Sequence, residues 1–330
     1  MPMVRNPTKK VTIKRTLIGI AVTVVTLGAL VALFVPFGGR GADAANGDRR
    51  QGGSASGDRD RDHDRVDLAR RITDFTRDTV ARSDYLPPLR AQRRTAAEAV
   101  GLFLDGRRAE AGRRLDDIDF GIRTYTDTAT GRRFAEISDR AAEGRRGWGR
   151  VYIDLSATPR WSVQVPHPVA DSGSEQLGIG VLRARRGGVL VMAGAHRDAD
   201  KKGRADVAHR RDTVFDAVCD ELAARRFPGL QVHGFADSTE PDYDVIASLG
   251  SADKGLPTAR RAATALRHEG FAVCRAWARR CALEGRGNVQ GREAEDQGVP
   301  FLHMEFSRTV RDDAPRVRRA AAAMAAALPS

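Results

Sequence analysis

Apolar runs and amphipathic stretches alternate along the chain from residue 161 to the C-terminal end. Runs rich in Val, Ile, Leu and Phe predict strands, and apolar residues three or four positions apart predict helices. The predicted strands span 161–167, 188–196, 230–235, 243–250, 271–278 and 300–307. The predicted helices span 175–186, 212–226, 256–270 and 318–328. This alternation is typical of an α/β fold in which helices cover both faces of a mostly parallel or mixed sheet.

The pattern ahead of this region is different. Residues 66–84 and 95–117 show helical spacing and are separated by Pro87 and Pro88, which interrupt a helix. We therefore expect an N-terminal helical region over residues 66–117.

Residues 120–140 contain two strand-like runs on either side of a short polar stretch that ends in Gly131. A glycine in that position favours a tight turn, so a β-hairpin is predicted. The hairpin opens an α/β domain that we expect to cover residues 118–330.

The N-terminus predicts where the protein resides. Lysines and arginines precede an uncharged apolar run at 16–39, which is long enough to cross a bilayer as a helix. Positive charge ahead of such a helix keeps the N-terminus in the cytoplasm and places the rest of the chain outside. We expect residues 1–39 to be a cytoplasmic tail and transmembrane signal anchor. Residues 42–44 resemble the small-residue cleavage site of a signal peptide. A cleaved signal peptide, and hence a secreted protein, is therefore an alternative.

Residues 40–65 combine Gly, Ser and alternating charges, and nothing in them can build a core. This composition predicts a disordered linker between the membrane and the folded part of the chain.

The 330-residue chain carries a formal net charge of +12, most of it from arginine. A basic chain can attract nucleic acid, anionic lipid or an anionic polymer. The sequence has no zinc knuckle, no aromatic-rich basic strand and no recognition-helix pattern, so nucleic acid is not a predicted partner. Either the arginines reflect general residue usage or they serve an acidic substrate or surface.

Three cysteines are too few for a disulfide scaffold, so the apolar core has to carry the fold. Cys274 and Cys281 are close enough in sequence to pair in an oxidising compartment, which would leave Cys219 as a free thiol. All three could equally be small apolar side chains.

Histidines follow several of the predicted strands. His167, His196 and His233 stand at or near strand ends, and ligands of open α/β sheets bind at the carboxyl ends of strands. Zinc prefers histidine nitrogens and carboxylates, and a catalytic zinc keeps one position for water. Glu175 follows His167, and Glu305 lies in an apolar strand where burying a carboxylate is costly unless it is paired or used.

The order of these segments resembles a known family. VPHPVADSGSEQLG at 165–178, VHGF at 232–235 and the segment 287–311 are similar to the zinc-binding segments of phage poly-gamma-glutamate hydrolases, which are akin to zinc carboxypeptidases. The likeness extends over about residues 160–312.

The resemblance implies that His167, Glu175 and His233 bind Zn²⁺ and that Glu305 is the catalytic base. It also implies that Arg308 or Arg311 lies near the site.

Several residues admit a second interpretation. Ser172 and Glu175 have the spacing of a capping box, in which Glu175 would bond the helix start instead of a metal. Asp171 could bind the metal, although an Asp-Ser-Gly turn is an ordinary role for it. Glu305 could form a buried ion pair with Arg308 or Arg311.

Two further histidines are alternatives to these ligands. His196 ends a predicted strand as well as His233 does, so it is a rival for the third ligand position. His303 lies two residues from Glu305 and shares a strand face with it, so it could orient the site or simply pack.

The predicted function is metal-assisted amide hydrolysis outside the cytoplasm. Arg197, Arg308 or Arg311 would hold a substrate carboxylate through paired hydrogen bonds. A peptide-like, acidic substrate follows, either poly-gamma-glutamate or cell-wall peptide. One alternative is a non-catalytic cell-envelope module that binds an anionic polymer through its arginines, and another is a zinc enzyme that cleaves esters.

Overall fold

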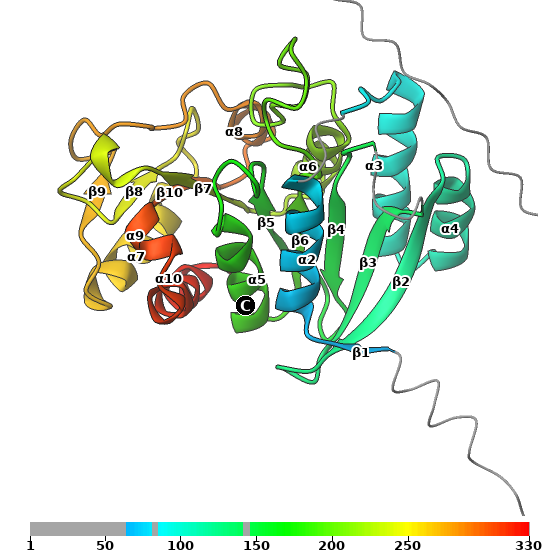
Figure 1. Ribbon diagram of the computed structural model, residues 1–330, viewed down its shortest axis with the longest axis horizontal. Coiled ribbons are helices and arrows are strands. Elements are labelled where there is room, and N and C mark those ends of the chain that lie inside the picture. The colour runs from blue at the N-terminus through cyan, green and yellow to red at the C-terminus, as the bar shows by residue number, and fades with distance from the viewer. Residues whose placement is uncertain (1–63, 81–84, 141–145, 330) are drawn as a thin grey trace, which may run out of the picture. The chain divides into compact units, whose positions relative to one another are not determined.

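A ten-stranded mixed sheet forms the centre of the computed structural model, which describes residues 64–80, 85–140 and 146–329. The strands are β1 (Arg65–Val66), β2 (Phe120–Asp127), β3 (Arg133–Asp139), β4 (Arg150–Asp154), β5 (Trp161–Val165), β6 (Gly188–Met192), β7 (Gly229–Phe235), β8 (Val245–Ser248), β9 (Val273–Arg275) and β10 (Phe301–Ser307). Their order across the sheet is β1-β2-β3-β4-β6-β5-β7-β10-β8-β9 (Figure 1). The four central strands β6, β5, β7 and β10 run parallel, and antiparallel neighbours flank them. The predicted mixed α/β sheet is confirmed.

Helices cover both faces of this sheet. They are α2 (Leu68–Val80), α3 (Arg90–Leu104), α4 (Arg108–Asp116), α5 (Ser174–Ala184), α6 (Val214–Ala224), α7 (Leu256–His268), α8 (Val289–Asp296), α9 (Arg308–Arg311) and α10 (Ala314–Ala327), with a short 3₁₀ helix η1 (Asp237–Thr239). One apolar core joins α2, α5, α7 and α10 to one face of the sheet, and a second core joins α3, α4 and α6 to the other. The helices predicted within residues 66–117 therefore pack on the same sheet as the rest of the described chain.

Side chains of β7 and β10 alternate between two very different environments. Leu230 and Val232 on β7, like Met304 on β10, enter the apolar core with α5 and α10. The residues between them point to the opposite face, where Gln231 and His233 are buried polar groups. Because β7 pairs with β10 in parallel register, the polar residues of the two strands stand side by side on this face.

The pairing brings three strands into this polar row. Gln231 on β7 is the register partner of Gln164 on β5 and of His303 on β10, and His233 is the partner of Glu305. A chain that buries this many polar side chains on adjacent strands must satisfy them by hydrogen bonds or by a ligand.

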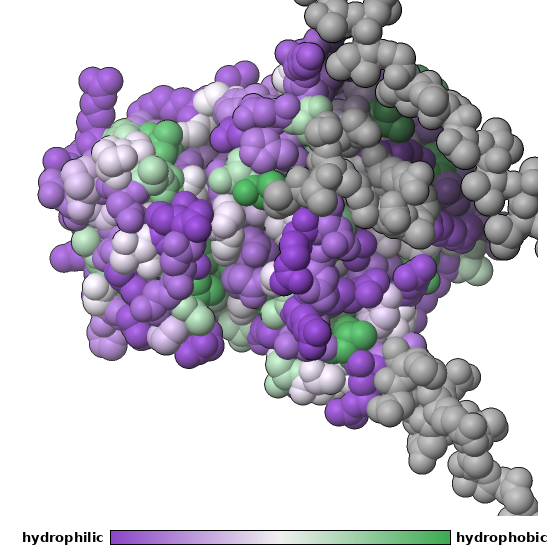
Figure 2. Space-filling model, in the orientation of Figure 1, coloured by the Kyte–Doolittle hydropathy of each residue, from purple (hydrophilic) through white to green (hydrophobic). Residues whose placement is uncertain are grey.

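No helix in the described ranges is long and apolar enough to cross a membrane. The predicted anchor at 16–39 and most of the predicted linker at 40–65 lie outside those ranges. The face of the described part shown in Figure 2 is mainly hydrophilic, with hydrophobic residues in small, separate areas.

A disulfide joins Cys274 to Cys281, and Cys219 is a buried free thiol on α6. This is the pairing that the sequence allowed.

Two acids lie one turn apart on α6, Asp216 buried and Asp220 half-buried. The Oδ1 atom of Asp216 accepts a 2.7 Å hydrogen bond from Gln290, whereas its Oδ2 atom has no partner. Burial raises the pKa of Asp216, and the charge of Asp220 adds to the effect. The pKa of Asp220 is raised by its own burial and by Glu293.

We expect this pair to make the protein less stable in alkali. A carboxyl group with a raised pKa stabilises the fold in its protonated form, and this contribution is lost as the pH rises through the folded-state pKa. Denaturant unfolding of the natural protein should give a free energy that falls by at least about 1 kcal/mol between about pH 5 and about pH 9. Asp216→Asn should reduce that fall, because an amide cannot ionise.

The exposed variant Asp242→Asn is the matched control and should keep the natural pH dependence. Equal pH slopes in the natural protein and in Asp216→Asn would contradict the burial of an uncharged Asp216.

Candidate metal centre

The first element of the site is the turn that follows β5. His167 stands two residues beyond the end of this strand and is only 1% exposed. The backbone N–H of Asp171 donates a 2.8 Å hydrogen bond to the carbonyl oxygen of His167, which closes one helical turn. The turn brings the Asp171 carboxylate back over the imidazole, with 3.5 Å between Oδ2 and the His167 Nδ1 atom.

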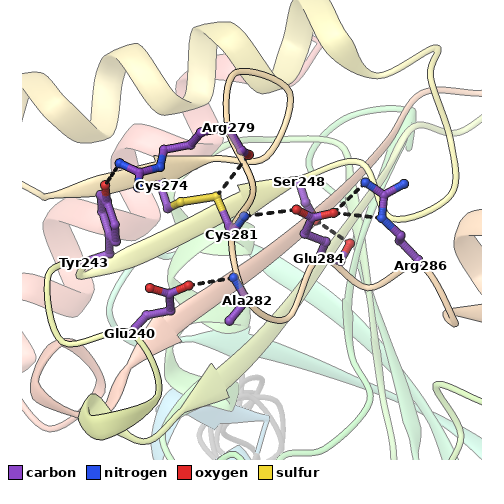
Figure 3. Close-up of a disulfide and its surroundings, with 9 residues drawn as sticks. All are labelled: Glu240, Tyr243, Ser248, Cys274, Arg279, Cys281, Ala282, Glu284 and Arg286. Carbon is purple, nitrogen blue, oxygen red and sulfur yellow. Dashed lines mark hydrogen bonds and ion pairs between the residues drawn. A yellow bond between two sulfur atoms is a disulfide. The ribbon is translucent and has the colours of Figure 1, made fainter.

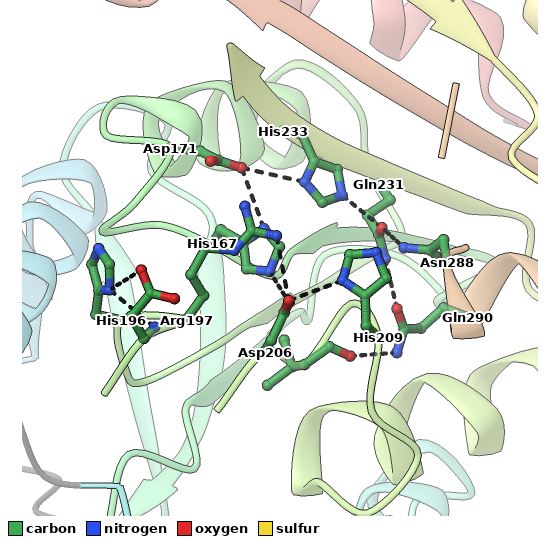
Figure 4. A network of polar contacts seen from close by, with 12 residues as sticks. His167, Asp171, His196, Arg197, Asp206, His209, Gln231, His233, Asn288 and Gln290 are labelled. Atoms are coloured by element: carbon green, nitrogen blue, oxygen red, sulfur yellow. Dashed lines mark hydrogen bonds and ion pairs between the residues drawn. The ribbon is translucent and has the colours of Figure 1, made fainter. Parts of the chain in front are cut away.

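The second element is the polar face of β7. The His233 Nδ1 atom lies 3.3 Å from the same Oδ2 atom of Asp171 (Figure 4). Ligand atoms from His167, Asp171 and His233 all lie within 4.8 Å of one another, and all three residues are buried. Two imidazole nitrogens and one carboxylate oxygen therefore face a common point.

The outer nitrogen of each imidazole is held by an oxygen atom. The His167 Nε2 atom lies 2.8 Å from Oδ1 of Asp206, and the His233 Nε2 atom lies 2.8 Å from Oε1 of Gln231. Histidines that bind metals have such a partner behind them, which sets the tautomer and the ring orientation.

The hydrogen bonds around Gln231 determine which nitrogen of His233 carries the proton. The Gln231 amide nitrogen donates to Gln164 and to Gln290, at 3.0 and 3.1 Å. Its oxygen therefore faces His233, and it also accepts from the amide nitrogen of Asn288. Because Gln231 Oε1 can only accept, His233 donates from Nε2 and keeps a lone pair on Nδ1.

With this tautomer, the lone pair on Nδ1 of His233 faces the carboxylate of Asp171, and a bound cation would relieve this unfavourable contact. Burial lowers the pKa of His233 to about 4, even though Asp171 opposes the shift. A neutral His233 therefore directs a lone pair at a carboxylate, and the buried Nδ1 atom of His167 has no hydrogen-bond partner. A divalent cation between the three groups would supply the missing partner, so these residues fit a zinc ion.

The charge states of the other two groups agree with this arrangement. Burial opposes ionisation of Asp171, but the two neighbouring imidazoles, His167 and His233, outweigh it and hold the pKa of Asp171 well below its usual range. Burial also disfavours a charged His167, yet the carboxylates of Asp171 and Asp206 beside it raise its pKa above the ordinary value. Metal binding would therefore release a proton from His167.

A second acid lies beside these three residues. Glu305 on β10 is buried next to His233, and its Oε2 atom has no hydrogen-bond partner. Burial raises the pKa of Glu305 well above its usual range, and the charge of Asp171 adds to the shift. Such a group is suited to accept and return a proton.

His303 provides an alternative metal position. Its ring lies 4.6 Å from the ring of His233, and His233, His303 and Glu305 also bring ligand atoms within 4.8 Å of one another. In this second group, however, both nitrogens of His233 already face other side chains, Asp171 and Gln231. We therefore favour the group that contains His167.

Glu175, the carboxylate ligand implied by the resemblance, belongs to neither group. Its Oε2 atom accepts a 2.9 Å hydrogen bond from the backbone N–H of Gly173, which is the N-cap of α5. Glu175 thus bonds the start of the helix, as its alternative interpretation predicted, although the cap is Gly173 and not Ser172. The structure favours Asp171 as the carboxylate ligand.

The three predicted substrate arginines differ in position. Arg197 lines the hollow in front of the site and lies 3.5 Å from Asp206. Arg308 is exposed and pairs with Asp312 at 2.6 Å. Arg311 is buried and donates to three backbone carbonyls, those of Phe306, Phe235 and Ser172. Of these three arginines, Arg197 lines the hollow, whereas Arg308 and Arg311 do not.

The hollow over the site has a volume of about 380 Å³. His167 does not line it; the polar and charged side chains that do include Asp171, His233, His303, Glu305, Arg197, His209 and Arg286. Arg286 was not singled out from the sequence, because it lies in an irregular loop among many other arginines. His196, the rival ligand, is 39% exposed at its side chain and faces Asp198, away from the three ligand residues.

We expect Arg311 to stabilise the fold and not to bind substrate. Arg311→Gln should lower the free energy of unfolding by about 2–4 kcal/mol, because buried carbonyls lose a charged donor. Denaturant unfolding measures the loss, and the exposed neighbour variant Arg308→Gln should be nearly neutral. An unchanged unfolding free energy together with a raised KM would contradict this and return Arg311 to the substrate site.

Comparisons with known proteins give only partial likenesses. No family model and no curated protein matches this chain. A gene product of Agrobacterium tumefaciens is similar over 51% of this chain and 88% of its own, with 10% identity and a TM-score of 0.38. A metallo-carboxypeptidase of Pseudomonas aeruginosa gives 54% and 59% coverage, 12% identity and a TM-score of 0.36. The tripeptide-bound cell shape determinant Csd4 of Helicobacter pylori gives 52% and 51%, with 13% identity and a TM-score of 0.34. The chemistry of the site has to be inferred from this chain's own residues.

Proposed function

We propose that this protein is an extracytoplasmic zinc-dependent amide hydrolase that acts on a peptide-like, acidic substrate. One observation carries the proposal. Two buried Nδ1 atoms and a carboxylate oxygen face a single point, and an acid with an unpartnered oxygen lies beside them.

His167, Asp171 and His233 would hold the ion. Zinc, when bound, would polarise an amide carbonyl and lower the pKa of a water molecule. Asp206 and Gln231 would keep the two imidazoles in the orientation that binding needs.

Glu305 would carry the proton. Its buried carboxylate lines the hollow, where it could accept a proton from the attacking water and pass it to the leaving nitrogen. The register partner of Glu305 is His233, so the base and one ligand come from adjacent strands and hold a fixed spacing.

The substrate class follows from the charges around the hollow. Arg197 and Arg286 are on its wall and could bind carboxylates of a substrate chain. Poly-gamma-glutamate and acidic cell-wall peptides both present an amide bond close to free carboxylates, so either fits this proposal.

Two features support a place outside the cytoplasm. The disulfide Cys274–Cys281 is typical of an oxidising compartment. The basic and apolar N-terminal sequence, with its uncharged run at 16–39, fits either a membrane anchor or a secretion signal.

Metal content tests which residues hold the ion. After zinc loading and dialysis, the full-length protein should retain about one equivalent, and His167→Ala and Asp171→Asn should each retain less than about half. His303→Ala should keep its zinc, as should the exposed control His268→Ala. Loss of zinc in His303→Ala with retention in His167→Ala would place the ion in the other group and refute our assignment.

Turnover tests the role of Glu305. Glu305→Gln should retain zinc but lower kcat for peptide or gamma-glutamyl hydrolysis by about 100-fold or more, because the amide cannot take up a proton. Peptide, gamma-glutamyl and ester substrates should be compared with and without a chelator. Chelator-resistant hydrolysis, or equal rates in Glu305→Gln and the natural protein, would rule out the proposed mechanism.

A further inference from the structure

A second hollow, about 640 Å³ in volume, lies beside the metal centre. Three arginines line it, Arg279, Arg280 and Arg286, together with a single acid, Glu284. The remaining lining residues are Ala276 and Cys281. Three guanidinium groups against one carboxylate make this an electropositive hollow, which we call the arginine hollow.

The arginine hollow and the hollow of the metal centre share a wall. Arg286 lines both of them. Along the segment that contains it, Leu283 and Gly285 face the metal centre, whereas Cys281 and Glu284 face the arginine hollow. A ligand that leaves the metal centre along this segment would therefore meet the arginines next.

The shared segment is anchored to the sheet at several points. The disulfide ties Cys281 to Cys274 on β9 (Figure 3). The hydroxyl of Ser248 on β8 donates a 2.9 Å bond to the carbonyl oxygen of Glu284. The N–H of Ala282 donates to the Glu240 carboxylate at 2.7 Å. A segment held in this way loses little conformational freedom when a ligand binds to it.

The arginines differ in how far their charges are already satisfied. Arg286 pairs with Glu284 at 2.6 Å, and Arg279 donates a 2.6 Å bond to the hydroxyl of Tyr243. Arg280 makes neither a hydrogen bond nor an ion pair with the described part of the chain. The charge of Arg280 does act on Glu284 and helps to lower the pKa of that carboxyl group. One acid thus faces three bases, so the hollow keeps an excess of positive charge.

We propose that the arginine hollow is a substrate subsite that binds side-chain or alpha carboxylates of an acidic peptide, beyond the bond positioned at the metal centre. This assignment rests on the proposed function for its peptide substrate, and it adds a specificity site that contacts neither the metal ligands nor Glu305. Because the two hollows share a wall, an acidic peptide chain that spans both is a better match than an isolated anion.

The test is binding without turnover. Pentaglutamate in alpha and gamma linkage, and pentaglutamine as the neutral analogue, are titrated by calorimetry into full-length, zinc-loaded Glu305→Gln protein. The double substitution Arg279→Gln/Arg280→Gln should weaken pentaglutamate binding by about fivefold to tenfold and leave pentaglutamine unaffected. Both arginines are exposed, so the fold should be retained.

The matched control is Arg113→Gln/Arg114→Gln, an adjacent exposed pair on α4 that removes the same charge. Pentaglutamate should bind this control as tightly as it binds the parent protein at equal ionic strength. Equal weakening in both double variants would show a general charge effect and overturn the subsite. Unchanged pentaglutamate affinity in Arg279→Gln/Arg280→Gln, or equally arginine-dependent binding of a short polyphosphate, would overturn it too.

The outcome separates the subsite from the proposed function. If the natural protein hydrolyses none of the peptides but pentaglutamate binding still requires Arg279 and Arg280, the hydrolase proposal fails and the subsite stands. If turnover is observed and the double variant has natural KM values for acidic and neutral peptides alike, the subsite alone fails.

Discussion

The contact of one Asp171 oxygen with two buried imidazoles is the constraint on which the site depends. It exists because His167 follows the end of β5 and a single helical turn returns Asp171 toward β7, where His233 stands. Two imidazole nitrogens and a carboxylate oxygen, all able to bind a metal ion, are held together by buried residues. A bound cation is the simplest way to satisfy them together.

Buried amides connect this contact to the helices behind it. Asn288 caps α8 through its side-chain oxygen, so its nitrogen is free to donate to Gln231. Gln231 in turn sets the tautomer of His233, and Gln290 links the same network to Asp216 on α6. Buried polar networks of this kind specify one arrangement when every member is satisfied. The hydrogen bond by which Asn288 caps α8 therefore also determines, through Gln231, which nitrogen of His233 keeps its lone pair.

The strands and the order of the histidines could be predicted from the sequence because apolar periodicity reports burial directly. The choice between Asp171 and Glu175 could not, since it depends on whether the chain after His167 makes a turn before α5 begins. The backbone contacts of Arg311 could not be predicted for a similar reason, as only the fold brings three carbonyls around it. A signal for the amide network was present, namely polar residues at every second position of β5, β7 and β10.

The most direct measurement is diffraction from crystals of the zinc-loaded protein at wavelengths on both sides of the zinc absorption edge. Our account predicts one anomalous peak within bonding distance of Nδ1 of His167, Nδ1 of His233 and the carboxylate of Asp171, with Glu305 beside it. A peak at any other group of side chains, or fully loaded crystals with no peak between these three, would contradict it.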